Sequence, residues 1–238
     1  MVAQLPQTTK AEVIYPDSDG KPMADNTLQF RWITIIKTNL DWLFADNPDV
    51  FVAGDLLWYP VEGDNKRRCA PDVMVIFGRE KGERGSYQQW KEGNIAPQVV
   101  FEILSPGNTM REMLNKLLFY QQYGVQEYYI YNPDSNDLTG FQRHNDILAM
   151  IEEIDNWTSP LLGIRFELNQ PELKIYHPNG DYFSSFNEEK QKASIEKLKA
   201  EKALADKEKA EADKEKEKAR ADKLEAKLRE LGINFDEI

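Results

Sequence analysis

The sequence predicts an α/β (α+β) fold, in which a mixed β-sheet core is flanked by helices and followed by a long charged C-terminal helix. Short apolar runs typical of strands alternate with two segments that have helical spacing of their apolar residues. The order is helix, three strands, helix, strand and further strands, which suits helices covering a mixed sheet. Residues 184–231 contain no proline or glycine and are rich in strong helix formers, so they are expected to form one helix.

Two helices are predicted within the sheet domain, over residues 27–45 and from Thr109 to residue 123. In the first helix, apolar residues recur at intervals of three and four, and Asp25 or Asn26 can cap its start. Thr109 is the expected cap of the second helix. Gly124 is expected to end it in the left-handed conformation that glycine adopts readily.

The strands are predicted from runs of apolar and aromatic residues bounded by Pro, Gly, Asn and Asp. Three of these runs lie between the two predicted helices and one follows the second helix. The remaining runs lie close together in the rest of the sheet domain. The predicted strands are residues 50–59, 72–77, 98–104 and 127–131, followed by 138–143, 147–154, 159–166 and 173–176.

Composition divides the chain into three predicted parts. Residues 1–26 are an irregular N-terminal segment, residues 27–183 the sheet domain, and residues 184–238 a charged helical tail. Opposite charges recur three or four positions apart along the tail and support an exposed helix. Its apolar seam is weak, so the tail is either a possible coiled coil that makes homo-oligomers or a lone charged helix without a partner.

The charge of the chain is unevenly distributed. Residues before Glu188 include 16 Lys and Arg and 26 Asp and Glu, which gives this part a net charge of −10. Such an acidic body argues against tight non-specific binding to duplex DNA, which requires Lys and Arg. It does not exclude an enzyme that meets phosphate through a divalent cation. Cys69 is the single cysteine, and no stretch approaches the length of a membrane span, so a soluble cytoplasmic protein without membrane contact is expected.

Two acids in apolar surroundings form a candidate metal site. Glu102 interrupts the buried strand predicted over residues 98–104, and Asp72 heads another apolar run. A buried carboxylate is costly unless a cation or metal pairs with it. Two carboxylates that converge on one hard cation suit Mg²⁺, with Mn²⁺ as the alternative. Such a cation can activate a bound water and stabilise charge on an attacked phosphate.

A fixed positive charge would complete such a site. Leu104 shares a strand face with Glu102 and cannot supply it, whereas Lys116 in the following helix flanks the apolar stripe and could point along the sheet. The alternative for Lys116 is an ordinary lysine that extends to solvent. Asp72 and Glu102 could likewise be solvated acids at strand ends.

The polar loop of residues 78–97 is long enough to be functional. It is the most basic and aromatic part of the body. It is interpreted either as a solvated loop whose Trp90 folds back on the core, or as a flap that meets substrate phosphates and stacks on bases. His144 and His177 are expected at the surface, and Cys69 is expected to be a small buried residue.

The linked motifs PDVMVIF, VVFEILSPGNT, a helical lysine, and FYQQYGVQEYYIYNP resemble the Uma-two family of restriction-endonuclease-like proteins, within the PD-(D/E)xK nuclease superfamily. The resemblance covers about residues 28–176 and leaves the tail outside. Three positions depart from the usual family pattern: Gly107-Asn108 replaces Ser-Thr, Glu112 replaces Asp, and Tyr129 replaces Trp.

The resemblance implies a restriction-endonuclease-like fold and roles for three residues. Asp72 and Glu102 would be the metal ligands. Lys116 would replace the superfamily lysine, which is absent because Leu104 stands at its usual position. The leading hypothesis is a Mg²⁺-dependent DNA endonuclease that hydrolyses phosphodiester bonds with Asp72, Glu102 and Lys116 as catalytic residues. The alternative is a non-catalytic nucleic-acid-binding or assembly module that uses the C-terminal helix for interactions.

Overall fold

The computed structural model describes residues 13–20 and 22–230. Its internal contacts divide the chain into two units, one that ends at Ser184 and one that begins at Ser185. Each unit is described by itself. The predictions for residues 1–12 and for the end of the tail beyond Glu230 lie outside the described residues.

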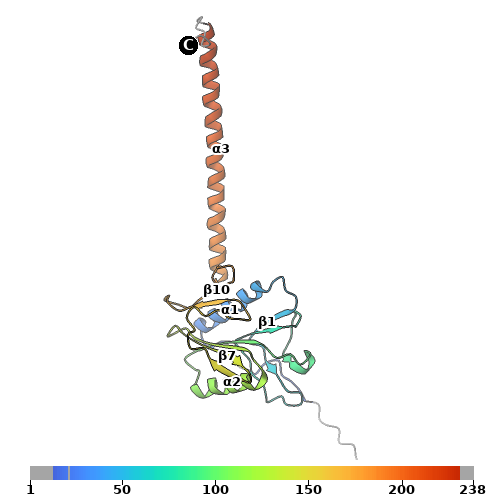
Figure 1. The fold of residues 1–238 in the computed structure, drawn as a ribbon. Coiled ribbons are helices and arrows are strands. Elements are labelled where there is room, and N and C mark those ends of the chain that lie inside the picture. The colour runs from blue at the N-terminus through green and yellow to red at the C-terminus, as the bar shows by residue number, and fades with distance from the viewer. Residues whose placement is uncertain (1–12, 21, 231–238) are drawn as a thin grey trace, which may run out of the picture. The chain divides into compact units, whose positions relative to one another are not determined.

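A six-stranded sheet forms the centre of the first unit (Figure 1), with the strand order β1-β3-β5-β6-β7-β8. Only β5 and β6 pair in parallel, and the other four pairs are antiparallel, so the sheet is mixed as predicted. The strands are β1 Val50–Gly54, β3 Val73–Phe77, β5 Val99–Ile103, β6 Glu127–Asn132, β7 Asp137–His144 and β8 Ile147–Met150.

Two helices lie on opposite faces of this sheet, α1 (Thr27–Leu43) and α2 (Met110–Tyr123) (Figure 1). Successive strand residues point to opposite faces. In β5, Val99, Phe101 and Ile103 join the core beneath α1, while Val100 joins the core that contains Tyr120 of α2. Residue 102 therefore belongs to the face that α2 covers. The predicted fold class is confirmed.

The helix ends have the predicted caps. The Asn26 side chain accepts a hydrogen bond from the backbone N–H of Gln29, and Thr109 accepts one from Glu112. Gly124 ends α2 at φ 91°, in the left-handed region. These caps set the position at which each helix begins over the sheet.

The predicted strand over residues 50–59 is wrong in its middle. It breaks at Asp55, which has a left-handed φ of 48°, and resumes as the two-residue β2 (Trp58–Tyr59). Strand β2 pairs in parallel with β4 (Tyr87–Gln88), which lies within the region predicted as a loop. A short 3-10 helix (Gln89–Lys91) follows β4. Part of the segment of residues 78–97 is therefore ordered by β-pairing, which its polar composition does not predict.

The end of the first unit also differs from the prediction. The last two predicted strands are shorter, β9 (Arg165–Glu167) and β10 (Lys174–Tyr176), and they form their own two-stranded sheet. His144 is exposed as expected. His177 is buried, and its Nε2 lies 3.2 Å from Asn39 Oδ1. The surface prediction for His177 failed because two residues that enclose it, Asn39 and Trp42 of α1, are distant in the sequence.

The second unit is the long helix α3 (Phe186–Glu230), and none of its side chains is buried. Ion pairs three or four residues apart occur along it, among them Arg229 with Glu225. No helix in the described part of the chain is long and apolar enough to cross a membrane.

Because α3 contributes no buried side chain, removal of residues 188–238 should leave the first unit folded. We expect its midpoint of thermal unfolding to change by less than about 3 °C, measured by circular dichroism. Asn39→Ala is the comparison, because the Asn39 amide donates to the buried carbonyl oxygens of Ile35 and Ser184. This change should lower the midpoint by several degrees.

A drop in the midpoint on truncation as large as that of Asn39→Ala would contradict the independence of the first unit. Light scattering on the same proteins tests the predicted self-association of the tail. If the tail makes oligomers, the particle mass relative to the chain mass should fall on truncation.

Candidate active site

Glu102 is the buried charge at the centre of the candidate site. Its side chain is on the α2-facing side of β5, and the residue is only 2% exposed. Lys116 Nζ lies 2.7 Å from Glu102 Oε2, and the Tyr120 hydroxyl donates to Oε1. Both carboxylate oxygens therefore have a partner, which a carboxylate at this depth requires.

Both partners come from one face of α2. Lys116 and Tyr120 are four residues apart and are therefore neighbours on the helix surface. Tyr120 is the buried residue of α2, and it places this face against β5. Burial alone would lower the pKa of Lys116, but the charge and hydrogen bond of Glu102 outweigh burial and raise that pKa above its usual value. Lys116 is therefore a permanent cation at neutral pH.

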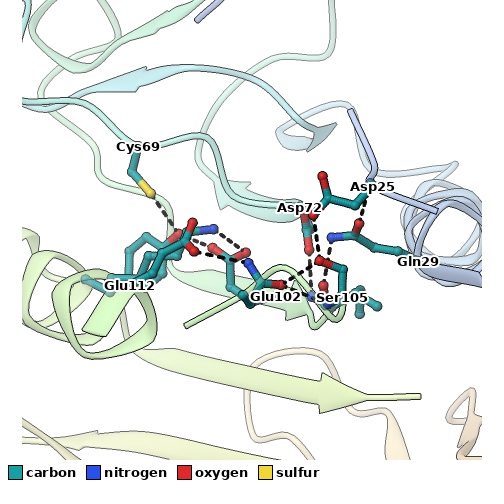
Figure 2. Close-up of polar contacts among 11 residues, drawn as sticks. Asp25, Gln29, Cys69, Asp72, Glu102, Ser105 and Glu112 are labelled. Atoms are coloured by element: carbon teal, nitrogen blue, oxygen red, sulfur yellow. Dashed lines mark hydrogen bonds and ion pairs between the residues drawn. The ribbon is translucent and has the colours of Figure 1, made fainter. Parts of the chain in front are cut away.

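Asp72 lies beside this pair. It is 8% exposed, and its Oδ2 accepts a hydrogen bond of 2.6 Å from the backbone N–H of Ile103, the residue after Glu102. Figure 2 shows Asp72 and Glu102 at this end of β5. Burial, followed by the charge of Glu102, raises the pKa of Asp72 to about 8. The charge of Glu102 thus adds to burial in opposing the ionisation of Asp72, and a cation between the two side chains would favour it.

Asp55 is a third acid near the site, and the sequence pattern missed it. It follows β1 at the break in the predicted strand, and its backbone N–H lies 3.2 Å from the carbonyl oxygens of both Pro71 and Asp72. Burial and the charge of Asp19 raise the pKa of Asp55. Lys116 lowers this pKa, and Glu102 raises it further. The signal in the sequence is the Gly54-Asp55 pair within the apolar run, since aspartate tolerates the left-handed conformation seen at Asp55 better than most residues.

Cys69 extends the polar network away from Glu102 (Figure 2). Its Sγ lies 3.2 Å from the Tyr120 hydroxyl oxygen. Burial raises the pKa of the Cys69 thiol to about 12, so the thiol stays protonated at neutral pH. Cys69 is only partly buried, so the expected buried position is met in part, and a protonated thiol does not favour a role as nucleophile.

Residues at and just before the start of α1 hold the same end of β5, where the chain leaves Glu102 (Figure 2). Gln29 Nε2 donates to the Ile103 carbonyl oxygen at 2.9 Å, and Ser105 Oγ donates to Asp25 Oδ2 at 2.6 Å. A Cβ atom at Gly107 would lie 3.1 Å from that same Asp25 oxygen, so glycine leaves room for the contact. These contacts fix the chain that leaves Glu102.

The two arginines in the loop of residues 78–97 are not free to bind a substrate. Arg79 and Arg84 both lie within ion-pair distance of Glu92, and Trp90 packs on Tyr15 with ring centroids 4.8 Å apart. The interpretation of a loop that folds back on the domain is therefore the better one.

The carboxylates present set what metal could bind. Within the described ranges, no group of three or more His, Cys, Asp or Glu side chains is arranged to hold a metal ion. Mg²⁺, however, usually binds one or two carboxylates and completes its shell with water and substrate phosphates. Asp72 and Glu102 meet that requirement, and each oxygen retains a further lone pair. The residues fit Mg²⁺ better than a metal that needs a full protein cage. The catalytic and ligand roles of Asp72, Glu102 and Lys116 stay predictions.

The hydrogen bond to Glu102 should make Tyr120 important for stability. We expect Tyr120→Phe to lower the free energy of unfolding by about 1–3 kcal/mol, because it leaves a buried carboxylate oxygen without its donor. Tyr128→Phe is the matched control. The Tyr128 ring packs on the Tyr120 ring, and the buried Tyr128 hydroxyl has no hydrogen-bond partner within the described residues. Its loss should change the stability by less than about 0.5 kcal/mol.

Urea denaturation of the two variants measures both values. Equal losses in Tyr120→Phe and Tyr128→Phe would mean that the hydrogen bond to Glu102 contributes nothing specific.

The raised pKa of Asp72 predicts a pH dependence of stability in metal-free buffer. Between about pH 4, the ordinary aspartate value, and about pH 8, the folded protein retains a proton on Asp72 that the unfolded chain has lost. The contribution of Asp72 to the free energy of unfolding should therefore fall as the pH rises, by at most about 1.4 kcal/mol per pH unit.

Urea denaturation at several pH values in EDTA measures this slope. Asp72→Asn should flatten it, while Asp137→Asn, which removes an exposed aspartate of β7, should leave it unchanged. Parallel curves for wild type and Asp72→Asn would contradict the assignment.

Comparison with known proteins supports the resemblance deduced from the sequence motifs. The model of the Uma2 family, described as "Putative restriction endonuclease", matches residues 13–170. A crystal structure described as a "putative nuclease belonging to DUF820", from Anabaena variabilis ATCC 29413, is 16% identical, with 63% of this chain and 85% of that chain covered and a TM-score of 0.47. A likeness at that level supports no inference about activity. The search of curated proteins found no match. Because the family match spans more than half of the sequence, this chain belongs to the Uma2 family.

Proposed function

We propose that this protein is a Mg²⁺-dependent DNA endonuclease whose catalytic domain is residues 27–183. The observation that supports it most is the convergence of three groups from different elements. Glu102 of β5 lies 2.7 Å from Lys116 of α2, and Asp72 accepts a hydrogen bond from the residue that follows Glu102. The family description as a restriction endonuclease supports the same reaction class.

Asp72 and Glu102 would hold the cation, which would activate water and offset charge on the attacked phosphate. Their burial favours this role, because it keeps the two carboxylates in place without a ligand. In the hydrolysis itself, the oxygen of water forms a bond to phosphorus, a P–O bond of the backbone breaks, and the leaving oxygen takes a proton.

Lys116 would act as a fixed cation rather than as a base. Its raised pKa keeps it protonated, so it can stabilise negative charge on phosphate but has no free lone pair with which to accept a proton. Its contact with Glu102 places the ammonium group beside the carboxylate that would bind metal. Lys116 thus supplies the positive charge that Leu104 cannot.

A plasmid-nicking assay in Mg²⁺ tests the proposal. Glu102→Gln should reduce the rate by at least about 100-fold, since even outer-shell partners of metal ligands cost about 10- to 100-fold. The matched control is Glu127→Gln, which alters another buried glutamate on the neighbouring strand β6. The Glu127 carboxylate accepts hydrogen bonds from Tyr129, Ser159 and Leu161.

Glu127→Gln should lower stability but retain cleavage per folded molecule. Cleavage that survives Glu102→Gln would remove the assignment. Absence of cleavage in the wild type with Mg²⁺ and with Mn²⁺ would favour the alternative, a non-catalytic binding or assembly module.

A further inference from the structure

A groove of about 440 Å³ adjoins the candidate active site on the α2 side. Lys116 and Cys69 line it, and both connect directly to the network around Glu102, Lys116 by its ion pair and Cys69 through Tyr120. The rest of its lining comes from the start and middle of α2 and from Arg68, which precedes Cys69. The groove therefore adjoins the residues that contact Glu102.

The arginines of this groove differ from the other arginines of the domain. Six of the eight arginines between residues 13 and 186 bind a carboxylate or backbone carbonyl oxygens, namely Arg31, Arg67, Arg79, Arg84, Arg143 and Arg165. Arg68 and Arg111 have no such partner within the described part of the chain, and both line the groove. The two arginines of the domain that have no carboxylate or carbonyl partner among the described residues thus both lie beside the candidate active site.

The two arginines are suited to an anionic ligand. Arg68 is half-buried, and its Nη1 lies 3.3 Å from the Tyr59 hydroxyl oxygen. This neutral contact positions the guanidinium group without a carboxylate that would neutralise its charge. Arg111 is exposed in the first turn of α2. Guanidinium binds phosphate with two parallel hydrogen bonds and is weakly hydrated, so it is a better phosphate ligand than an ammonium group.

An aromatic ring lines the same groove. Phe119 is half-buried and packs by its edge on Trp58 and Tyr123, with ring centroids 5.3 Å and 4.7 Å away. These neighbours hold the ring rigidly at the groove wall. A ring held beside phosphate-binding cations is the arrangement by which proteins bind single strands, because an unstacked base can pack on it.

We propose that this groove binds a single-stranded segment of nucleic acid, with Arg68 and Arg111 on phosphates and Phe119 against a base. The inference rests on the proposed nuclease function, whose substrate class it narrows to strands with unpaired bases. A larger hollow of about 850 Å³ near β8 is lined by Glu152, Glu153 and Asp155, which would repel phosphate, so it does not offer an alternative route.

Fluorescence anisotropy with short labelled oligonucleotides in EDTA tests the groove without cleavage. Single-stranded DNA should bind at least tenfold more tightly than a duplex of the same length. The doubly substituted Arg68→Gln/Arg111→Gln protein should lower the slope of log K against log salt by about 1.4, since each phosphate contact on a single strand contributes about 0.7. Lys91→Gln removes an exposed cation outside the groove and should leave the slope unchanged.

The base contact has its own pair of variants. Phe119→Leu should weaken binding to single strands about tenfold, whereas Phe119→Tyr keeps the ring and should bind like the wild type. Thermal unfolding of each variant establishes that it is folded, and if Phe119→Leu is not, the double arginine variant alone decides.

The result that overturns the proposal is an unchanged salt slope in the double arginine variant, tighter binding to duplex, or no binding of any oligonucleotide by the wild type. The nicking assay separates this outcome from failure of the proposed function. Cleavage that depends on Glu102 with no effect of Arg68 and Arg111 would reject the groove and retain the nuclease.

Discussion

The ion pair between Glu102 and Lys116 is the interaction on which the arrangement of this domain depends. A carboxylate that is 2% exposed must have its charge compensated, and Lys116 and Tyr120 do so from adjacent turns of α2. Helix α2 can supply both hydrogen-bond partners of the Glu102 carboxylate only if the helix face that carries Lys116 and Tyr120 lies against β5. The cap at Thr109 and the left-handed Gly124 set the ends of the helix accordingly. Local sequence signals and a buried charge thus specify the same packing.

What the sequence could predict follows from the range of each interaction. Glu102 was recognisable because a charge within five apolar strand positions is anomalous, and Lys116 because helical periodicity placed it beside the stripe that packs on the sheet. The role of Tyr120 has no such signal, because a tyrosine on the apolar stripe reads as core whether or not its hydroxyl contacts an acid. The contact of Gln29 with Ile103 joins residues 74 positions apart and has no local signal. Asp55 was hidden because a left-handed residue interrupts what reads as one continuous strand.

Net charge was a poor guide to the local electrostatics of this domain. The excess of acids argues against non-specific duplex binding, but most of the domain's arginines are already neutralised by acids or held by backbone carbonyl oxygens. The acidity is therefore not spread evenly over the surface. It coexists with a groove in which Arg68, Arg111 and Lys116 face one acid, Glu112. Such a local cluster of cations can attract an anionic ligand in spite of the net negative charge of the domain.

The two buried glutamates of neighbouring strands show how burial alone fails to identify a functional acid. Glu127 lies on the α1-facing side of the sheet and is held by neutral donors from Tyr129, Ser159 and Leu161, which tie a distant turn to the sheet. Glu102 lies on the other face, beside a lysine, a second buried acid and a groove. The Glu127 contacts close a structural network, whereas those of Glu102 leave Asp72 with a raised pKa that a bound cation would lower. What distinguishes Glu102 here is a second buried acid with a raised pKa and a groove beside its partner Lys116.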